Sequence, residues 1–367
     1  MGRALQAAPF FINFTRNIIT NPVLLSMNNK IRKSKKNSRK IRVAVPVFNR
    51  GVFDFNAVFG ADPRAVISRI DKNNDDIPNQ VPAHRIEIRQ AGVVRENVPL
   101  RVLSPLSKKE QIVLNSRLEI FTRISKSRRG LHISRIGNVV ALVSQNNFKH
   151  IEDFILAIAR DTCKSQGSDE TKVKLTAPFS FYEDVLYMKN RLRKSLEHIT
   201  LIYSVTYKNG KSIFDAGLEF NNITACPCVQ QTFKHTLLER GGTDENIRKY
   251  FPLLTHSQRC KTKILIKSYT GHLNIAEILK IVDVSSVRVQ NTLPREHELN
   301  MVYRAHNNPK FMEDTVRDIA FNIFSGFKDK YPNSSILINT DSMESIHDFN
   351  IQAKIEESFK SLEKLLK

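Results

Sequence analysis

The sequence predicts an α+β protein built from two related halves. Segments in which apolar and polar residues alternate, as they do in half-buried strands, are interspersed with segments whose apolar residues recur at helical spacing. Both halves follow a similar order of strands and helices. At 367 residues, the chain is long enough for two such modules. Its 41% hydrophobic and 25% charged residues are typical of a soluble globular protein with a core.

The residue pattern of the first half predicts the order strand, strand, helix, strand, strand. Residues 84–94 and 116–125 alternate like strands, and residues 148–163 carry apolar side chains at helical spacing. Residues 198–224 predict two further strands that are joined by an Asn-Gly turn. Together these elements form one compact unit.

The second half repeats this theme. No repeat is visible in the residues themselves, so the duplication is inferred from the order of the elements alone. The expected elements are a strand at 260–269, helices at 273–282, 297–306 and 311–327, a strand at 334–340, and a closing amphipathic helix at 352–367.

Much of the positive charge lies in an N-terminal extension. The formal net charge is +21, and residues 1–53 hold eleven Lys and Arg but no Asp or Glu. We expect residues 1–74 to be disordered or poorly packed. The extension can be a basic arm, an organelle-targeting segment, or a consequence of translation starting upstream of Met27. A net charge of this sign suits an anionic partner.

The composition also limits the environment. No run approaches the roughly 20 uninterrupted apolar residues of a membrane-spanning helix, so we expect no membrane partner. Four cysteines, at 163, 226, 228 and 260, are too few and too unevenly spaced for a disulfide framework. They indicate a reducing compartment, and we expect the cytoplasm.

Side chains that suit a metal gather in the second half. Cys226 and Cys228 flank a proline, His256 lies in a polar run before a strand, and Glu344 and His347 are three residues apart. Taken singly, a cysteine can be a small buried hydrophobe, and a histidine or glutamate can be merely solvated. Taken together, a thiolate, two imidazoles and carboxylates form a donor set that zinc or iron(II) accepts, with a position left open for water. The reaction class that this implies is metal-assisted hydrolysis.

The same residues carry a family resemblance. The motifs "ITACPCVQ", "THSQR", "AHNNPKFMEDTVRDI" and "ESIH", in this order, resemble the type IB metal-dependent GTP cyclohydrolases, which comprise bacterial folate-pathway and archaeal methanopterin-pathway enzymes. The segment "SKSRRGLHISRI" is similar to a motif in that family's first half. The resemblance covers residues 75–350.

The resemblance implies a tunnelling fold (T-fold) with two tandem modules of antiparallel sheet backed by helices, here 75–223 and 224–367. It also implies a homotetramer with sites at subunit interfaces. GTP would be the substrate, and its imidazole ring would be opened with release of formate. The product would be 7,8-dihydroneopterin triphosphate or its 2',3'-cyclic phosphate, which opens pterin biosynthesis.

The resemblance assigns roles to individual residues. A divalent metal, expected to be Fe(II) with Zn or Mn as alternatives, would be held by Cys226, His256, Glu298 and His347. Glu344 would lie beside the metal and carry protons, while Glu313 would accept the N–H hydrogens of guanine. The residues expected to bind the rest of the substrate, chiefly its triphosphate, are His132, Arg135 and Arg259, with Arg129, Lys261 and Lys263 as further candidates.

Two departures from the family pattern leave other functions open. Phe349 stands where a second histidine is usual, and Cys260 replaces the usual glycine after Gln-Arg. A catalytically weakened relative that binds a purine or pterin therefore remains an alternative. A basic nucleic-acid-binding protein is another, although the extension lacks interleaved aromatic residues. The long insert between Cys226 and His256 favours the archaeal type.

Overall fold

The computed structural model describes residues 76–187, 191–249, 252–291 and 294–366, together with Asp62 and Ala65. The chain divides into two units, Met1–Lys72 and Asn73–Lys367, and every element below belongs to the second. The expectation of a disordered extension over residues 1–74 falls, apart from Asp62 and Ala65, outside the described residues.

Within the described residues, the first half contains four long strands, two helices and a short bridging strand. After a 3-10 turn η1 (Ile77–Asn79), its elements are β1 (Ile88–Leu103), β2 (Gln111–Ile124), α4 (Ile133–Val143), β3 (Asn147–Phe148), α5 (Ile151–Gln166), β4 (Glu170–Tyr187) and β5 (Arg191–Lys208).

The second half repeats the strand, strand, helices, strand, strand order and adds an insert. Its elements are β6 (Lys211–Ala225), α6 (Pro227–Glu239), α7 (Asp244–Arg248), β7 (Ser257–Tyr269), α8 (Ile275–Ser285), β8 (Val287–Arg288), α9 (Arg295–Asn307), α10 (Met312–Phe327), β9 (Ser335–Met343), β10 (Ile351–Ser358) and α11 (Phe359–Leu365). Helices α6 and α7 lie in the long insert between Cys226 and His256.

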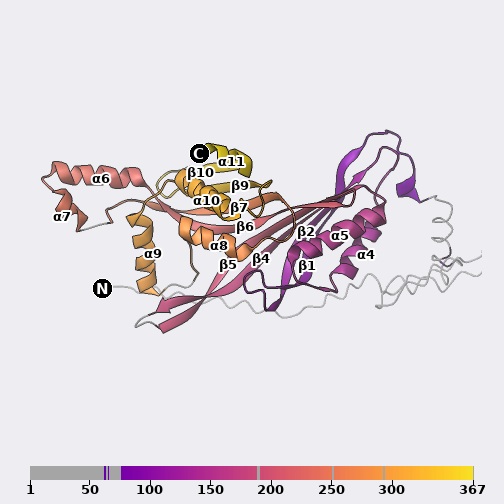
Figure 1. Ribbon diagram of the computed structural model, residues 1–367, viewed down its shortest axis with the longest axis horizontal. Helices are drawn as coiled ribbons and strands as arrows, with labels where there is room; N and C mark the ends of the chain where they lie inside the picture. Colours follow the sequence, from indigo (N-terminus) through magenta and orange to yellow (C-terminus); the bar gives the residue numbers. More distant parts are fainter. Residues whose placement is uncertain are drawn as a thin grey trace, which may run out of the picture. The chain divides into compact units, whose positions relative to one another are not determined.

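All the long strands form one sheet in the order β10-β9-β7-β6-β5-β4-β2-β1, and each neighbouring pair is antiparallel. Helix α5 packs on β4 and β5, while α8 and α10 pack on strands of the second half (Figure 1). This arrangement confirms the α+β class and the antiparallel, helix-backed halves of a tunnelling fold.

The halves meet at the β5–β6 hairpin. Asn209 and Gly210 form its turn with φ angles of 48° and 81°, the left-handed pair that a two-residue hairpin of this kind requires. The division at residue 223 stays a prediction. The strand order favours an earlier division at this turn, because β6 occupies in the second half the place that β1 occupies in the first.

Three elements differ from the sequence-based expectation. Helix α4 and strand β4 were not predicted. The expected helix at 352–367 is wrong over its first part, because residues 351–358 form β10 and only Phe359–Leu365 is helical. Strand β10 pairs with β9 from Ile351 to Ser358, and this pairing satisfies backbone groups that β9 would otherwise leave unpaired.

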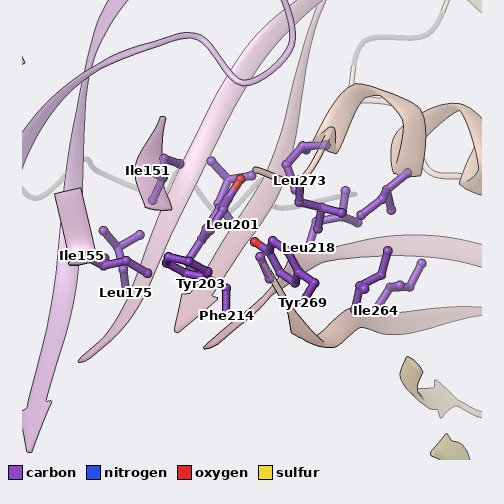
Figure 2. Packing of buried hydrophobic residues seen from close by; sticks show 14 of the residues in the cluster. Ile151, Ile155, Leu175, Leu201, Tyr203, Phe214, Leu218, Ile264, Tyr269 and Leu273 are labelled. Carbon is purple, nitrogen blue, oxygen red and sulfur yellow. The ribbon is translucent and has the colours of Figure 1, made fainter. Parts of the chain in front are cut away.

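One hydrophobic core runs under both halves. Figure 2 shows Ile155 of α5 beside Leu175 and Tyr203 of the first half, and Phe214 and Tyr269 of the second half close by. Each of these five side chains is at most 5% exposed to solvent. The two modules therefore share their apolar interior.

Ionic contacts on the exposed face tie β10 to the sheet. Glu356 pairs with Lys267 of β7 and Lys354 of β10, which lowers the pKa of this exposed carboxyl to about 2 from an ordinary 4.5. A depressed pKa stabilises the fold above pH 4.5, and the contribution is lost as the pH falls towards 2. We expect Glu356→Gln to lower the free energy of unfolding slightly at pH 7 and to have a smaller effect near pH 2, where about half of the carboxyl is already protonated.

Urea unfolding across that pH range measures this effect, and Glu357→Gln in the same strand is the matched control. A Glu356→Gln effect of equal size at both ends of the range would contradict the ionic origin.

No helix within the described residues is long and apolar enough to cross a membrane.

Candidate metal and substrate site

The ends of two neighbouring strands bring Cys226 and His256 together. Ala225 at the end of β6 pairs with Ser257 at the start of β7. Cys226, which follows Ala225, therefore lies opposite His256, which precedes Ser257. The backbone N–H of Cys226 donates to the carbonyl of His256 at 3.1 Å. The hydroxyl of Thr255 donates to the carbonyl of Cys226 at 2.6 Å. The insert of about thirty residues therefore returns to the point at which it left the sheet.

The connection after β9 adds His347 and Glu344 to this end of the sheet. The rings of His256 and His347 lie edge to face, with centroids 6.4 Å apart. Ser345 Oγ lies 3.4 Å from His256 Nδ1. Ser342 Oγ donates to Glu344 Oε1 at 2.7 Å, which holds that carboxylate at the end of β9.

Local sequence explains why Cys226 stands where a strand becomes a helix. Cys226 has extended backbone angles, and Pro227, which cannot continue a strand ladder but suits the first turn of a helix, begins α6. Buried Gln230 then donates from Nε2 to the carbonyls of Leu253 and His306 at 3.1 and 2.8 Å. Gln230 was missed by sequence reasoning, because nothing in the sequence shows that a helix glutamine faces two distant carbonyls.

The predicted metal ligands are only partly gathered within one chain. Among the described residues, the one group of three or more His, Cys, Asp or Glu donor atoms that lie within 4.8 Å of one another is His150, Asp153 and His272. Cys226, His256 and His347 share one end of the sheet without reaching that proximity. Glu298 is exposed in the first turn of α9, and no hydrogen bond or ion pair joins it to the other three in the described part of the chain.

The predicted guanine and phosphate ligands lie in three places. Glu313 is exposed in the first turn of α10. Arg259 is exposed on β7, three residues beyond His256, and Lys261 on the same strand pairs with Glu219 at 2.8 Å.

His132 and Arg135 lie in the first half, where they contact Asp76. Buried His132 has Nδ1 at 3.0 Å from Asp76 and Nε2 at 3.1 Å from Asn79, and its backbone exchanges two hydrogen bonds with Gln166. The guanidinium of Arg135 is 3.9 Å from Asp76. The structure therefore gives both residues partners within the first half and does not bring them to Cys226 in a single chain.

The two departures from the family pattern have defined surroundings. Cys260 is fully buried, lies 3.3 Å from the hydroxyl of Thr224, and stands opposite Ser342 in the neighbouring strand. Burial raises the pKa of its thiol, so Cys260 stays protonated near neutral pH. Phe349 stacks on His347, with ring centroids 4.9 Å apart and planes 9° from parallel.

A cavity of about 270 Å³ opens beside the end of β6. Its lining includes Ala225, Tyr303, Asn307 and Lys310. Nearby on α9, the Nε2 atom of His306 is buried and has no hydrogen-bond partner among the described residues. Burial lowers the pKa of His306, which favours its neutral form. Sequence reasoning did not single out His306, although the polar run that contains it is part of a recognised motif.

Comparison with known proteins identifies the family of this chain. The model of the type I GTP cyclohydrolase folE2 family (GCHY-1) matches residues 75–353. GTP cyclohydrolase MptA of Thermoplasma volcanium is 25% identical over 301 residues, which are 79% of this chain and 98% of that protein. MptA of Methanocaldococcus jannaschii is 28% identical over 289 residues, 74% of this chain and 91% of that protein.

Among solved structures, uricase from Arthrobacter globiformis aligns with a TM-score of 0.43 at 8% identity, over 74% of this chain and 94% of that one. The family match spans both halves of the sheet and includes every segment that meets at the ends of β6, β7 and β9. The chain therefore belongs to the type I GTP cyclohydrolase folE2 family and is a GTP cyclohydrolase of pterin biosynthesis.

Proposed function

We propose that this protein hydrolyses the imidazole ring of GTP, releases formate, and forms 7,8-dihydroneopterin triphosphate or its 2',3'-cyclic phosphate. The observation that carries the proposal is the meeting of Cys226, His256 and His347 at one end of the second half, since these residues stand far apart in the chain. The match to the GTP cyclohydrolase family supplies the substrate.

Cys226, His256, His347 and Glu298 are the proposed ligands of one divalent metal ion. A thiolate, two imidazoles and a carboxylate suit iron(II), the metal that we expect, with zinc or manganese as alternatives. Cys226 and His256 are partly exposed and His347 is exposed, so an ion can reach them. An ion held there would supply Lewis acidity, by which a water molecule becomes nucleophilic near neutral pH.

The protein's own groups then have to move protons and hold the base. Glu344, whose Oε1 atom is fixed by Ser342, accepts the proton of the attacking water and returns it to the departing ring nitrogen. His347 is oriented by the stacked ring of Phe349, and His256 by Ser345. These contacts keep the donors in place before substrate arrives, which favours catalysis.

Recognition of guanine is assigned to Glu313, and the triphosphate to Arg259 with His132 and Arg135. A carboxylate accepts from the two adjacent N–H groups of guanine, a donor pair that adenine lacks. His132 and Arg135 stand in the other half, so the proposal requires a second subunit or a change of partners at Asp76 to bring them to the substrate. A homotetramer with sites at subunit interfaces meets this requirement.

We expect Glu313→Gln to raise KM for GTP by roughly a hundredfold with a smaller effect on kcat. The amide presents one donor to the guanine N–H pair, so a charged hydrogen bond is lost and a donor faces a donor. Steady-state kinetics at saturating metal measure the change. Asp329→Asn, in the exposed turn that follows the same helix, is the matched control. An unchanged KM in Glu313→Gln removes the anchoring role.

The direct test is metal-reconstituted protein incubated with GTP. Formate release and a fluorescent pterin after oxidation are the expected results, and mass spectrometry of the product separates the triphosphate from the cyclic phosphate. Phe349 in place of the usual histidine favours one alternative, a weakened relative that binds purines or pterins. GTP binding without formate release under every metal condition would support that alternative.

A nucleic-acid-binding role would depend on the basic residues 1–53, which lie outside the described residues, so no structural observation favours it.

A further inference from the structure

A second cluster of metal-ligand side chains lies away from Cys226, between elements of the two halves. His150 precedes α5, Asp153 lies in the first turn of that helix, and His272 lies in the connection between β7 and α8. His272 Nε2 is 2.9 Å from Asp153 Oδ1. The rings of His150 and His272 stack with centroids 3.8 Å apart and planes 15° from parallel.

The backbone on both sides of this cluster is firmly held. The carbonyl of His272 accepts a hydrogen bond from the hydroxyl of Tyr331 at 2.7 Å. The N–H of Leu273 donates to the buried carboxylate of Glu152 at 2.8 Å. Figure 2 shows Ile151 and Leu273, the chain neighbours of the two histidines, as members of the same buried cluster. The imidazoles therefore project from backbone that the core has already positioned.

The donor set selects a class of ion. Two imidazoles and one carboxylate suit zinc and its neighbours cobalt, nickel and copper, whereas magnesium and calcium prefer oxygen ligands alone. Ligand bonds of about 2.0–2.2 Å place two donors on one ion at most about 4.4 Å apart. The three donor atoms already lie within 4.8 Å of one another. Because an imidazole nitrogen binds a metal in the plane of its ring, the two rings have to turn out of their parallel stack to bind one ion.

The charges around the cluster are compatible with ligation. Burial is the main cause that lowers the pKa of His150, with smaller contributions from His272, Lys108 and Lys149, while Asp153 opposes the shift. Asp153 supplies the carboxylate of the donor set, beside the two imidazoles.

We propose that His150, Asp153 and His272 form a structural binding site for a zinc-like divalent transition-metal ion that cross-links α5 of the first half to the β7–α8 connection of the second. This site is separate from the one assigned to GTP hydrolysis and does not depend on that function. Three protein ligands leave at least one position for water. The expected consequence is a more stable union of the halves, because an ion that binds only the folded chain stabilises it.

Zinc binding to the full chain tests the proposal, with isothermal titration and metal analysis as readouts. We expect two zinc ions per chain in the unaltered protein, one in His272→Ala, and two in His235→Ala, an exposed histidine on α6 that serves as the control. Asp153→Asn provides a second variant, with binding expected to weaken at least tenfold. Cobalt binding distinguishes the two sites by their absorption spectra, because only cobalt bound at Cys226 gives a thiolate-to-metal charge-transfer band.

Stability supplies an independent readout in a Cys226→Ala background. At a hundredfold excess of zinc over its Kd, we expect the melting temperature to rise by about 5 °C. The rise should vanish in Cys226→Ala/His272→Ala, while the two proteins melt alike in chelator. Equal zinc binding with and without His272, or no zinc binding in Cys226→Ala, would overturn the proposal. Failure of GTP turnover with this zinc site intact would instead count only against the proposed function.

Discussion

Cys226→Ala is expected to lower the rate of GTP hydrolysis by at least about a thousandfold. The variant removes the thiolate from the proposed metal site and leaves the imidazoles of His256 and His347 without their sulfur partner. Because Cys226 contributes to the local fold through its backbone, which pairs with His256 and Thr255, the fold should survive the loss of the side chain. Formate release and metal content per chain are the measurements.

Cys228→Ala is the matched control. Its thiol is exposed in the first turn of α6, two residues from Cys226 and in the same insert. We expect this variant to keep its metal and most of its activity. The ligand assignment would be wrong if Cys226→Ala retained both its metal and its activity. It would also be wrong if the two variants lost activity equally while their melting temperatures matched that of the unaltered protein.

Gly217→Ala should destabilise the fold by about 3 kcal/mol. Gly217 lies in β6, where an added Cβ would stand 1.9 Å from the carbonyl oxygen of Ile264 in β7. The obstacle is backbone in a central strand pair, so relief requires the two strands to separate. The free energy of unfolding in urea measures the loss, and GTP hydrolysis should fall with it because β6 and β7 position Cys226 and His256.

The control is Gly137→Ala in α4, where nothing lies within 4 Å of the added Cβ. Alanine is a better helix former than glycine, so this variant should gain up to about 1 kcal/mol. Equal effects of the two substitutions would show that the close approach of β6 and β7 is absent in solution.

Gly92 stands in the first half where Gly217 stands in the second. An added Cβ there would lie 1.7 Å from the carbonyl oxygen of Ile120, the same type of contact with the next strand. Each glycine follows an alanine, in Ala91-Gly92 and Ala216-Gly217, and each pair follows a break in strand register. The two dipeptides therefore occupy equivalent positions in the two halves, whose relation was inferred from the order of the elements.

The predicted site residues divide according to how they are brought together. Cys226 and His256 each border a strand end, so their place at an edge of the sheet follows from local pattern. Whether the end of β6 meets the start of β7 depends on the pairing of two strands that about thirty residues separate, and only the fold decides this pairing. Glu298 and Glu313 were assigned by motif, and in a single chain both are exposed at helix starts. Their role stays a prediction, since a site shared between subunits is not visible in one chain.

Local sequence determined the features that depend on near neighbours. These include the alternation of β7, the helical spacing of α5 and α10, the Asn-Gly turn between β5 and β6, and the ordered motifs of the family. Tertiary structure alone decided the rest. Residues 351–358 carry a pattern that fits a helix, yet they pair with β9 because that strand offers an unpaired edge. His150 and His272 are more than a hundred residues apart in the chain. Their contact likewise depends on long-range packing, which no local segment of sequence can specify.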